Sequence, residues 1–368
     1  MRVLLTGGGT GGHIYPALTL AAELKKGNHS LLYVGTAGGL EQELVPRAGL
    51  PLRTISVSGL ERRISFRNIL AFFRLGKGLF QAYQILREFR PSVVVGTGGY
   101  VSVPVVFTAS LLKIPTLIHE QNALPGLANR FLSRFVRVVA VTYEESQSYF
   151  PQARRLVVTG NPVREEVLNL TRDEGRMRLN VEEGKQLLLI FGGSRGARPI
   201  NEAVLAALPI LREQRDLFIY FITGKGDYER IRQRLGLGIG KEKMGNIIIK
   251  PYLHDMPAGL AAADLVVARA GATTLAELTA RGIPAILIPS PYVTGNHQEK
   301  NARLLERQGA ALVMPENELT GSSLGQKVLK ILQTPQLQRQ MGKNSYSLGK
   351  REAGEALLAL ICKLNPGE

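Results

Sequence analysis

Short apolar runs alternate with amphipathic segments along the whole chain. Runs such as RVLLT, SVVVG and DLVVARAG are nearly continuous in small and branched apolar residues, which is typical of strands covered on both faces by helices. Such strands, each followed by a helix-like segment, predict an α/β protein with doubly wound parallel sheets. A single cysteine, Cys362, excludes a disulfide scaffold and favours a reducing compartment.

A polar, charged segment that begins near Pro162 divides the strands into two similar series. With 368 residues, 45% of them hydrophobic, the chain is long enough for two domains with separate cores. We therefore expect two Rossmann-like domains, residues 1–163 and 164–340, that face a central cleft. A C-terminal helix over about residues 341–368 follows no strand of its own, and we expect it to pack back on the first domain.

Glycine-rich turns follow three of the predicted strands and precede predicted helices: GGGTGGH at 7–13, GTGGYVS at 96–102 and GGSRGA at 192–197. A fourth turn, RAGATT at 269–274, has the same setting. Free backbone N–H groups and the helix dipole make such turns suitable for phosphate, although glycine also serves in tight turns without a ligand. No P-loop motif is present and the glycine spacing fits dinucleotide binding poorly, which favours a nucleotide sugar.

Several polar residues of these turns are candidates for chemistry, and each has a structural alternative. His13 could accept a proton from a sugar hydroxyl, or could cap a helix or pack. Ser194 could bind a diphosphate oxygen or be an N-cap. Glu277 could accept hydrogen bonds from ribose hydroxyls, or could compensate the helix dipole as an acid in the first turn. Arg164 could reach a nucleotide or be solvated. The cluster HEQN, residues 119–122, follows a buried strand and is interpreted as facing a ligand.

The formal net charge of +16 is concentrated in part between Arg62 and Arg90. This segment alternates basic residues with Phe, Leu and Ile, which is typical of a helix lying on an anionic membrane surface but also of a core helix with a solvated basic side. No zinc or RNA-binding pattern is found, so nucleic acid is not expected as a partner. No secretory signal or spanning segment is evident, and we expect a soluble protein at the cytoplasmic face of the membrane.

Seven motifs occur in order over residues 8–302: GGTGGHIYPAL, GTGGYVSVP, HEQNALPGLANR, GNPVR, GGSRGARPIN, RAGATTLAEL and HQEKNA. Together they resemble the MurG family of peptidoglycan glycosyltransferases. The resemblance implies a GT-B fold and inverting transfer of GlcNAc from UDP-GlcNAc to the C4 hydroxyl of MurNAc in undecaprenyl-pyrophosphoryl-MurNAc-pentapeptide. It implies no cofactor, and the chain has no Asp-x-Asp sequence to hold a metal on the diphosphate. With such an acceptor, the second glycine turn, with Gly98, Gly99 and Tyr100, would be free for its pyrophosphate. The resemblance also implies a cell-wall synthesis complex as a further partner.

The resemblance also implies roles for individual residues. His13 would be the general base, Asn122 would contact GlcNAc, Leu253 would bind uracil through its backbone and Glu277 would bind the ribose. The complete donor site would comprise Thr10, Gly11, Gly12, Asn122, Arg164, Ser194, Leu253, Ala272, Thr273, Thr274, Leu275, Ala276, Glu277 and Gln298. Three other functions remain open from the residues alone: a UDP-GlcNAc 2-epimerase, a different glycolipid synthase and a non-catalytic scaffold that binds a nucleotide sugar.

Overall fold

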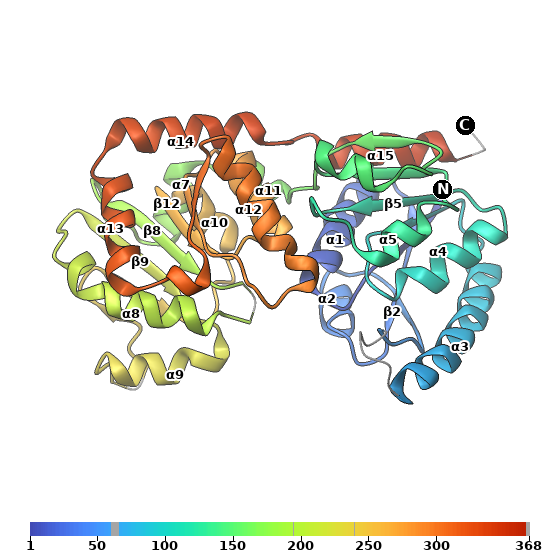
Figure 1. Ribbon diagram of the computed structural model, residues 1–368, viewed down its shortest axis with the longest axis horizontal. Helices are drawn as coiled ribbons and strands as arrows, with labels where there is room; N and C mark the ends of the chain where they lie inside the picture. Colours follow the sequence, from blue (N-terminus) through green and yellow to red (C-terminus); the bar gives the residue numbers. More distant parts are fainter. Residues whose placement is uncertain (60–65, 194, 239, 366–368) are drawn as a thin grey trace. The chain divides into compact units, whose positions relative to one another are not determined.

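The computed structural model describes residues 1–59, 66–193, 195–238 and 240–365, with the backbone only for residues 66–72. The chain divides into two compact units, one formed by Met1–Pro162 with Lys350–Glu368 and the other by Val163–Gly349. In each unit helices flank a central sheet (Figure 1).

The first unit contains a seven-stranded parallel sheet of order β3-β2-β1-β4-β5-β6-β7. Its strands are β1 (Arg2–Thr6), β2 (Ser30–Thr36), β3 (Leu52–Ile55), β4 (Val93–Gly96), β5 (Thr116–Glu120), β6 (Val138–Val141) and β7 (Leu156–Val158). Its helices are α1 (Gly11–Lys26), α2 (Glu41–Arg47), α3 (Phe66–Phe89), α4 (Ser102–Leu111), α5 (Leu127–Leu132), the short η1 (Glu144–Tyr149) and α15 (Ala353–Leu364).

The second unit repeats this topology, with the order β10-β11-β9-β8-β12-β13-β14 and an antiparallel β10 at the edge. Its strands are β8 (Gln186–Phe191), β9 (Leu217–Ile222), β10 (Lys243–Met244), β11 (Ile247–Lys250), β12 (Leu265–Ala268), β13 (Ala285–Leu287) and β14 (Ala311–Val313). Its helices are α6 (Glu165–Asn169), α7 (Arg172–Arg178), α8 (Arg198–Arg212), α9 (Lys225–Arg234), α10 (Met256–Ala262), α11 (Ala272–Arg281), η2 (Thr294–Asn296), α12 (His297–Arg307), η3 (Glu316–Glu318), α13 (Gly321–Leu332) and α14 (Pro335–Leu348).

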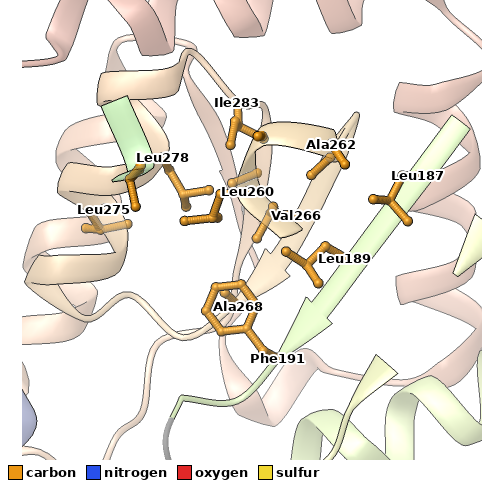
Figure 2. Close-up of a cluster of buried hydrophobic side chains, with 14 of the residues drawn as sticks. Leu187, Leu189, Phe191, Leu260, Ala262, Val266, Ala268, Leu275, Leu278 and Ile283 are labelled. Atoms are coloured by element: carbon orange, nitrogen blue, oxygen red, sulfur yellow. The ribbon is translucent and has the colours of Figure 1, made fainter. Parts of the chain in front are cut away.

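Each sheet has a hydrophobic core on both faces because successive side chains of a strand point in opposite directions. In β8, Leu187 and Leu189 join the core on one face and Leu188 and Ile190 the core on the other. Figure 2 shows the first of these cores, in which side chains of β8 and β12 meet those of α10 and α11. The apolar runs of the sequence therefore become fully covered parallel strands, as predicted.

Two short strands and the C-terminal region differ from the expectation. The sequence did not indicate β3, which carries the exposed Arg53 and Thr54, or the two-residue β10. The single helix expected over residues 341–368 is wrong: α14 ends at Leu348 in the second unit, and α15 begins at Ala353 in the first. In Figure 1, α15 returns at the end of the chain to the N-terminal elements, where it contacts α1.

Candidate active site

The glycine turns after β1 and β4 touch each other in the first unit, because these strands are neighbours. The backbone N–H of Gly8 donates to the carbonyl oxygen of Gly98 at 3.2 Å. A Cβ at Gly99 would lie 2.2 Å from the carbonyl oxygen of Gly8, so only glycine permits this approach. The strand order reverses between β1 and β4, and ligands of doubly wound sheets bind at that place.

The start of α1 faces this junction. Thr10 is its N-cap residue and makes no side-chain capping bond, and both Thr10 and Gly12 are exposed. The first N–H groups of a helix have no partner within the helix, so those of Gly11 and Gly12 suit a polar ligand. The ring of Tyr100 lies over the same turn, since a Cβ at Gly9 would lie 3.1 Å from its Cε1 atom.

His13, the third residue of α1, is oriented by the turn after β4. Its Nδ1 atom lies 3.1 Å from the carbonyl oxygen of Thr97, and the hydroxyl of Thr97 donates to the carbonyl oxygen of His13 at 2.7 Å. A carbonyl oxygen can only accept, so Nδ1 carries the proton and Nε2 has the lone pair. Capping of α1 by His13 is wrong because Thr10 holds that position. The half-buried imidazole can thus accept a proton at Nε2.

The interpretation of HEQN as a ligand-facing cluster is wrong for three of its residues. His119, Glu120 and Gln121 are 1%, 1% and 0% exposed, and only Asn122 is half-buried. One oxygen of Glu120 accepts from the backbone N–H and the side-chain amide of Asn122, at 3.0 and 3.2 Å. Its other oxygen accepts from Gly126 and Asn129 at 3.1 and 2.9 Å. These side chains therefore hold the loop after β5 in shape and orient Asn122.

Glu277 forms an ion pair with Arg164 in the second unit. Arg164 donates to the Oε1 atom of Glu277 from Nε at 2.8 Å, and its terminal nitrogen lies 2.7 Å from the same oxygen. Burial raises the pKa of Glu277 although the guanidinium of Arg164 opposes the shift. Glu277 is the sixth residue of α11, whose first turn holds no acid, so the dipole-compensating role is wrong. The structure thus joins two residues that the sequence separates by more than one hundred positions.

The N-terminus of α11 follows β12 directly, and its position is fixed by the core shown in Figure 2, where Leu275 and Leu278 point toward Leu260 and Val266. Its N-cap residue is Gly271, which offers no side-chain cap. The hydroxyl of Thr273 is buried and makes no hydrogen bond in the described part of the chain. Buried polar groups nearly always have partners, so this hydroxyl marks the helix start as a place that a ligand would complete.

The turn GGSRGA after β8 is shaped by close backbone contacts. Gly193 and Gly196 have φ angles of 88° and 76°, and a Cβ at Gly196 would lie 2.3 Å from the carbonyl oxygen of Thr223. Ser194 lies outside the described residues. The N-cap of α8 is Ala197, so the N-cap role considered for Ser194 belongs to a different residue. β8 and β12 flank the reversal of strand order in the second sheet, as β1 and β4 do in the first.

Two further candidates follow the strands β11 and β13 of the second sheet. Leu253 comes after β11 and is buried at 6% exposure, so its side chain belongs to the core and only its backbone could meet a ligand. Gln298, the second residue of α12, accepts at Oε1 from the backbone N–H of Ser290 at 2.9 Å. This bond ties α12 to the loop after β13. Glu277, Leu253 and Gln298 thus belong to elements that follow the carboxyl ends of parallel strands.

These paired strand-end turns agree with what the sequence matches. Residues 3–141 match the glycosyltransferase family 28 N-terminal domain, and residues 187–357 match the glycosyltransferase family 28 C-terminal domain. The chain belongs to glycosyltransferase family 28. The expectation of a glycosyltransferase is thereby confirmed.

Two relatives match nearly the full length of this chain and share the name UDP-N-acetylglucosamine–N-acetylmuramyl-(pentapeptide) pyrophosphoryl-undecaprenol N-acetylglucosamine transferase. The protein of Halalkalibacterium halodurans is 48% identical over 363 residues, which cover 98% of this chain and 99% of the relative. That of Bacillus subtilis is 45% identical over 366 residues, which cover 99% of each.

Solved structures confirm the GT-B fold. Acinetobacter baumannii MurG aligns with a TM-score of 0.77 and 29% identity, covering 98% of this chain and 99% of that one. UDP-GlcNAc 2-epimerase from Neisseria meningitidis, solved with UDP-GlcNAc, aligns with a TM-score of 0.69 over 99% of this chain and all of its own. Its identity of 12% shows a shared fold alone.

Sequence reasoning missed residues that support the turn after β1. Glu41, the first residue of α2, is fully buried, and its Oε1 atom accepts from the backbone N–H of Gly9 and the hydroxyl of Thr36, each at 3.2 Å. The glycine pair in TAGGLEQE, directly after β2, was the available signal. Among the described residues, no three metal-ligating side chains converge as they would around an ion.

Proposed function

We propose that this glycosyltransferase moves GlcNAc from UDP-GlcNAc to the C4 hydroxyl of MurNAc in undecaprenyl-pyrophosphoryl-MurNAc-pentapeptide. The observation that carries the proposal is 45–48% identity, over at least 98% of the chain, to relatives named for this transfer. The match covers 98–99% of each of these relatives, which supports a shared substrate pair.

The donor belongs to the second unit in this proposal. Glu277 accepts hydrogen bonds from the ribose hydroxyls, held in place by Arg164, and the backbone of Leu253 meets the uracil. Gln298 completes the site with Ala272, Thr273, Thr274, Leu275 and Ala276 at the start of α11, and with Ser194 in the turn before α8. Helices α8 and α11 have no side-chain caps, so their free N–H groups can stabilise the charge that develops on departing UDP.

The acceptor belongs to the first unit, where His13 is the general base. The C4 oxygen of MurNAc attacks the anomeric carbon of GlcNAc while its proton passes to Nε2 of His13. The bond between the anomeric carbon and the diphosphate oxygen breaks, UDP leaves with the electron pair, and the configuration inverts. The GlcNAc of the donor is lined by Thr10, Gly11, Gly12 and Asn122. The acceptor's pyrophosphate is received by Gly98, Gly99 and Tyr100. The proton on Nδ1, fixed by Thr97, supports this role because it leaves Nε2 basic.

We further propose that α3 holds the enzyme on the anionic cytoplasmic surface of the membrane. One stripe of α3 contains Phe73 and Phe80, which are 75% and 61% exposed, with the exposed Lys77 and Arg87 at helical spacing. The opposite side of α3 buries Ala82 and Leu86 in the core. The two interpretations of this segment, a membrane-surface helix and a core helix, therefore apply to its two faces. The part of the segment before Phe73 lies outside the described side chains. Across the described residues, no helix is both long and apolar enough to span a bilayer.

The transfer is tested with labelled UDP-GlcNAc and a lipid-linked pyrophosphoryl-MurNAc-pentapeptide. We expect a labelled disaccharide-lipid that is sensitive to a β-N-acetylglucosaminidase. An epimerase would instead convert UDP-GlcNAc to its 2-epimer without acceptor, and a scaffold would bind UDP-GlcNAc without turnover. Either result, or equal transfer to an acceptor that lacks the pyrophosphate, would refute the proposal.

A further inference from the structure

The buried imidazole of His119 has a defined tautomer. Its Nε2 atom lies 2.9 Å from the carbonyl oxygen of Gly160. Since that oxygen can only accept, the proton of the neutral ring resides on Nε2, and Nδ1 presents a lone pair. Burial lowers the pKa of His119 to about 4, so the ring stays neutral near pH 7.

This lone pair determines which way the amide of Gln121 points. The Nε2 atom of Gln121 lies 3.1 Å from Nδ1 of His119, 3.1 Å from the carbonyl oxygen of His119 and 2.8 Å from the carbonyl oxygen of Thr97. All three are acceptors, so only the NH₂ end of the amide fits there. The amide oxygen must then face Nδ1 of His13, at 3.2 Å. Gln121 is fully buried, so an amide turned the other way would lose these partners without gaining contact with bulk solvent.

We propose that Gln121, oriented by His119, is a positioning residue that holds His13 in the tautomer with the proton on Nδ1. The inference rests on the proposed role of His13 as general base. A chain of hydrogen bonds runs from Gly160 through His119 and Gln121 to His13, and its direction is fixed at the Gly160 end. It leaves Nε2 of His13 unprotonated and ready to accept the acceptor's proton, which the opposite tautomer could not do.

The charged groups near this chain are engaged elsewhere. Glu120, adjacent to Gln121 on β5, accepts from Asn122, Gly126 and Asn129. Glu41, beneath the turn after β1, accepts from Gly9 and Thr36. Neither carboxylate contacts His13 in these bonds, so neutral hydrogen-bonding groups, Gln121 and the Thr97 carbonyl, set its tautomer.

The tautomer can be measured directly in the intact protein labelled with ¹⁵N-histidine. The chain has five histidines, and loss of one signal set in His13→Ala assigns the resonances of His13. For the neutral ring, we expect the ¹⁵N shifts of His13 to report a protonated Nδ1 and an unprotonated Nε2. A protonated Nε2 in the wild-type protein would overturn the proposal. This measurement needs no turnover, so it fails or succeeds independently of the proposed transfer.

The variant Gln121→Met, similar in length but without the amide, tests the cause. We expect the second tautomer to appear, kcat to fall on the order of tenfold and KM for UDP-GlcNAc to stay near its wild-type value. His119→Phe should change the tautomer in the same direction. Gln186→Met is the matched control, because it removes a hydrogen bond from a side-chain amide to the carbonyl oxygen of Leu332 in the second unit. It should change neither the tautomer of His13 nor the kinetic constants. An unaltered tautomer in folded Gln121→Met would disprove the role of Gln121, and if that variant does not fold, the wild-type spectrum decides.

Discussion

Glu277 is a buried carboxylate that pairs with Arg164 and, in the proposed function, binds the ribose of UDP-GlcNAc. Glu277→Ala removes the acceptor for the ribose and frees Arg164, whose side chain is one-third exposed and can turn to solvent. We therefore expect KM for UDP-GlcNAc to rise by about tenfold or more, the cost of one or two charged hydrogen bonds, with a smaller change in kcat. Steady-state kinetics at varied UDP-GlcNAc measure this. Glu202→Ala, which removes an acid paired with Arg230 and Arg234 on a solvent-exposed side of α8, is the control, and an unchanged KM in Glu277→Ala would return Glu277 to a structural role.

His13 carries the chemical step in the proposal. His13→Ala should lower kcat by about 10²–10⁴-fold while UDP-GlcNAc still binds, because the donor contacts belong to other residues. Rapid-mix turnover and equilibrium dialysis with UDP-GlcNAc separate the two effects. A loss of only about twofold in kcat would be too small for a general base and would assign His13 a packing role.

His119 makes the stability of the protein depend on pH. Burial disfavours the charged ring and lowers the pKa of His119 from its ordinary value of 6.5 to about 4. Between these values the unfolded chain binds more protons, so the free energy of unfolding falls as pH drops from about 6.5 to about 4, by roughly 3 kcal/mol in total. Urea unfolding at a series of pH values should show this slope in the wild type and a smaller one in His119→Phe. Equal slopes would contradict it.

At this scale the sequence predicts residue types better than their partners. It singled out His13, Glu277 and Arg164 because they lie in or shortly after turns that follow predicted strands. It could not indicate that Arg164 pairs with Glu277 or that Thr97 orients His13. Those pairs depend on which strands are neighbours. HEQN was misjudged for a related reason: its first two residues end β5, and the carboxylate of Glu120 accepts from the backbone N–H of Gly126 in the following loop instead of facing a ligand.

The helix α3 is the element whose function depends most on one exposed face. Phe73→Ser combined with Phe80→Ser should reduce binding to vesicles containing anionic lipid, because it removes two large apolar groups from the stripe while the core-facing side of α3 remains. Vesicle sedimentation at low and high salt measures this, and the residual binding should be more salt-sensitive than in the wild type. Tyr346→Ser, at an exposed aromatic residue of α14 in the second unit, is the control. Undiminished binding by the folded double variant would exclude α3 as the membrane face.

Most strands were predictable because each is an apolar run, whereas β3 and β10 were not. β3 exposes Arg53 and Thr54 and has no apolar run, and β10 has only two residues, so strand pairing creates these elements. The separation of α14 from α15 was also hidden. Gly349 is the C-cap residue of α14, and a Cβ there would lie 2.6 Å from the carbonyl oxygen of Thr279. The helix therefore ends at a close tertiary contact that the sequence does not reveal.

At the scale of the whole molecule, the chain leaves the first unit after Pro162 and returns to it at Lys350. The points where the chain leaves and re-enters the first unit are adjacent, since a Cβ at Gly160 would lie 2.3 Å from the Cβ atom of Lys350. Gly160 has a φ of 85° and its carbonyl oxygen accepts from His119, so the crossing also anchors the hydrogen-bond chain to His13. The second unit, in contrast, is one continuous segment with its own complete sheet.

This continuity predicts that the two units differ in their ability to fold alone. Residues 163–349 should unfold cooperatively as an isolated fragment and bind UDP. Residues 1–162 should not be stable, because they lack Leu357, Leu360 and Ile361 of α15, which are 1%, 6% and 0% exposed in the core beside α1. Burying each of these side chains is worth about 1.5–3 kcal/mol, so their sum approaches the whole stability of a typical domain, about 5–15 kcal/mol. Joining residues 350–368 to residue 162 through a short flexible linker should restore cooperative thermal unfolding, since the two ends are adjacent at Gly160. A fragment of residues 1–162 that melts as cooperatively and at as high a temperature as the joined form would show that α15 is dispensable.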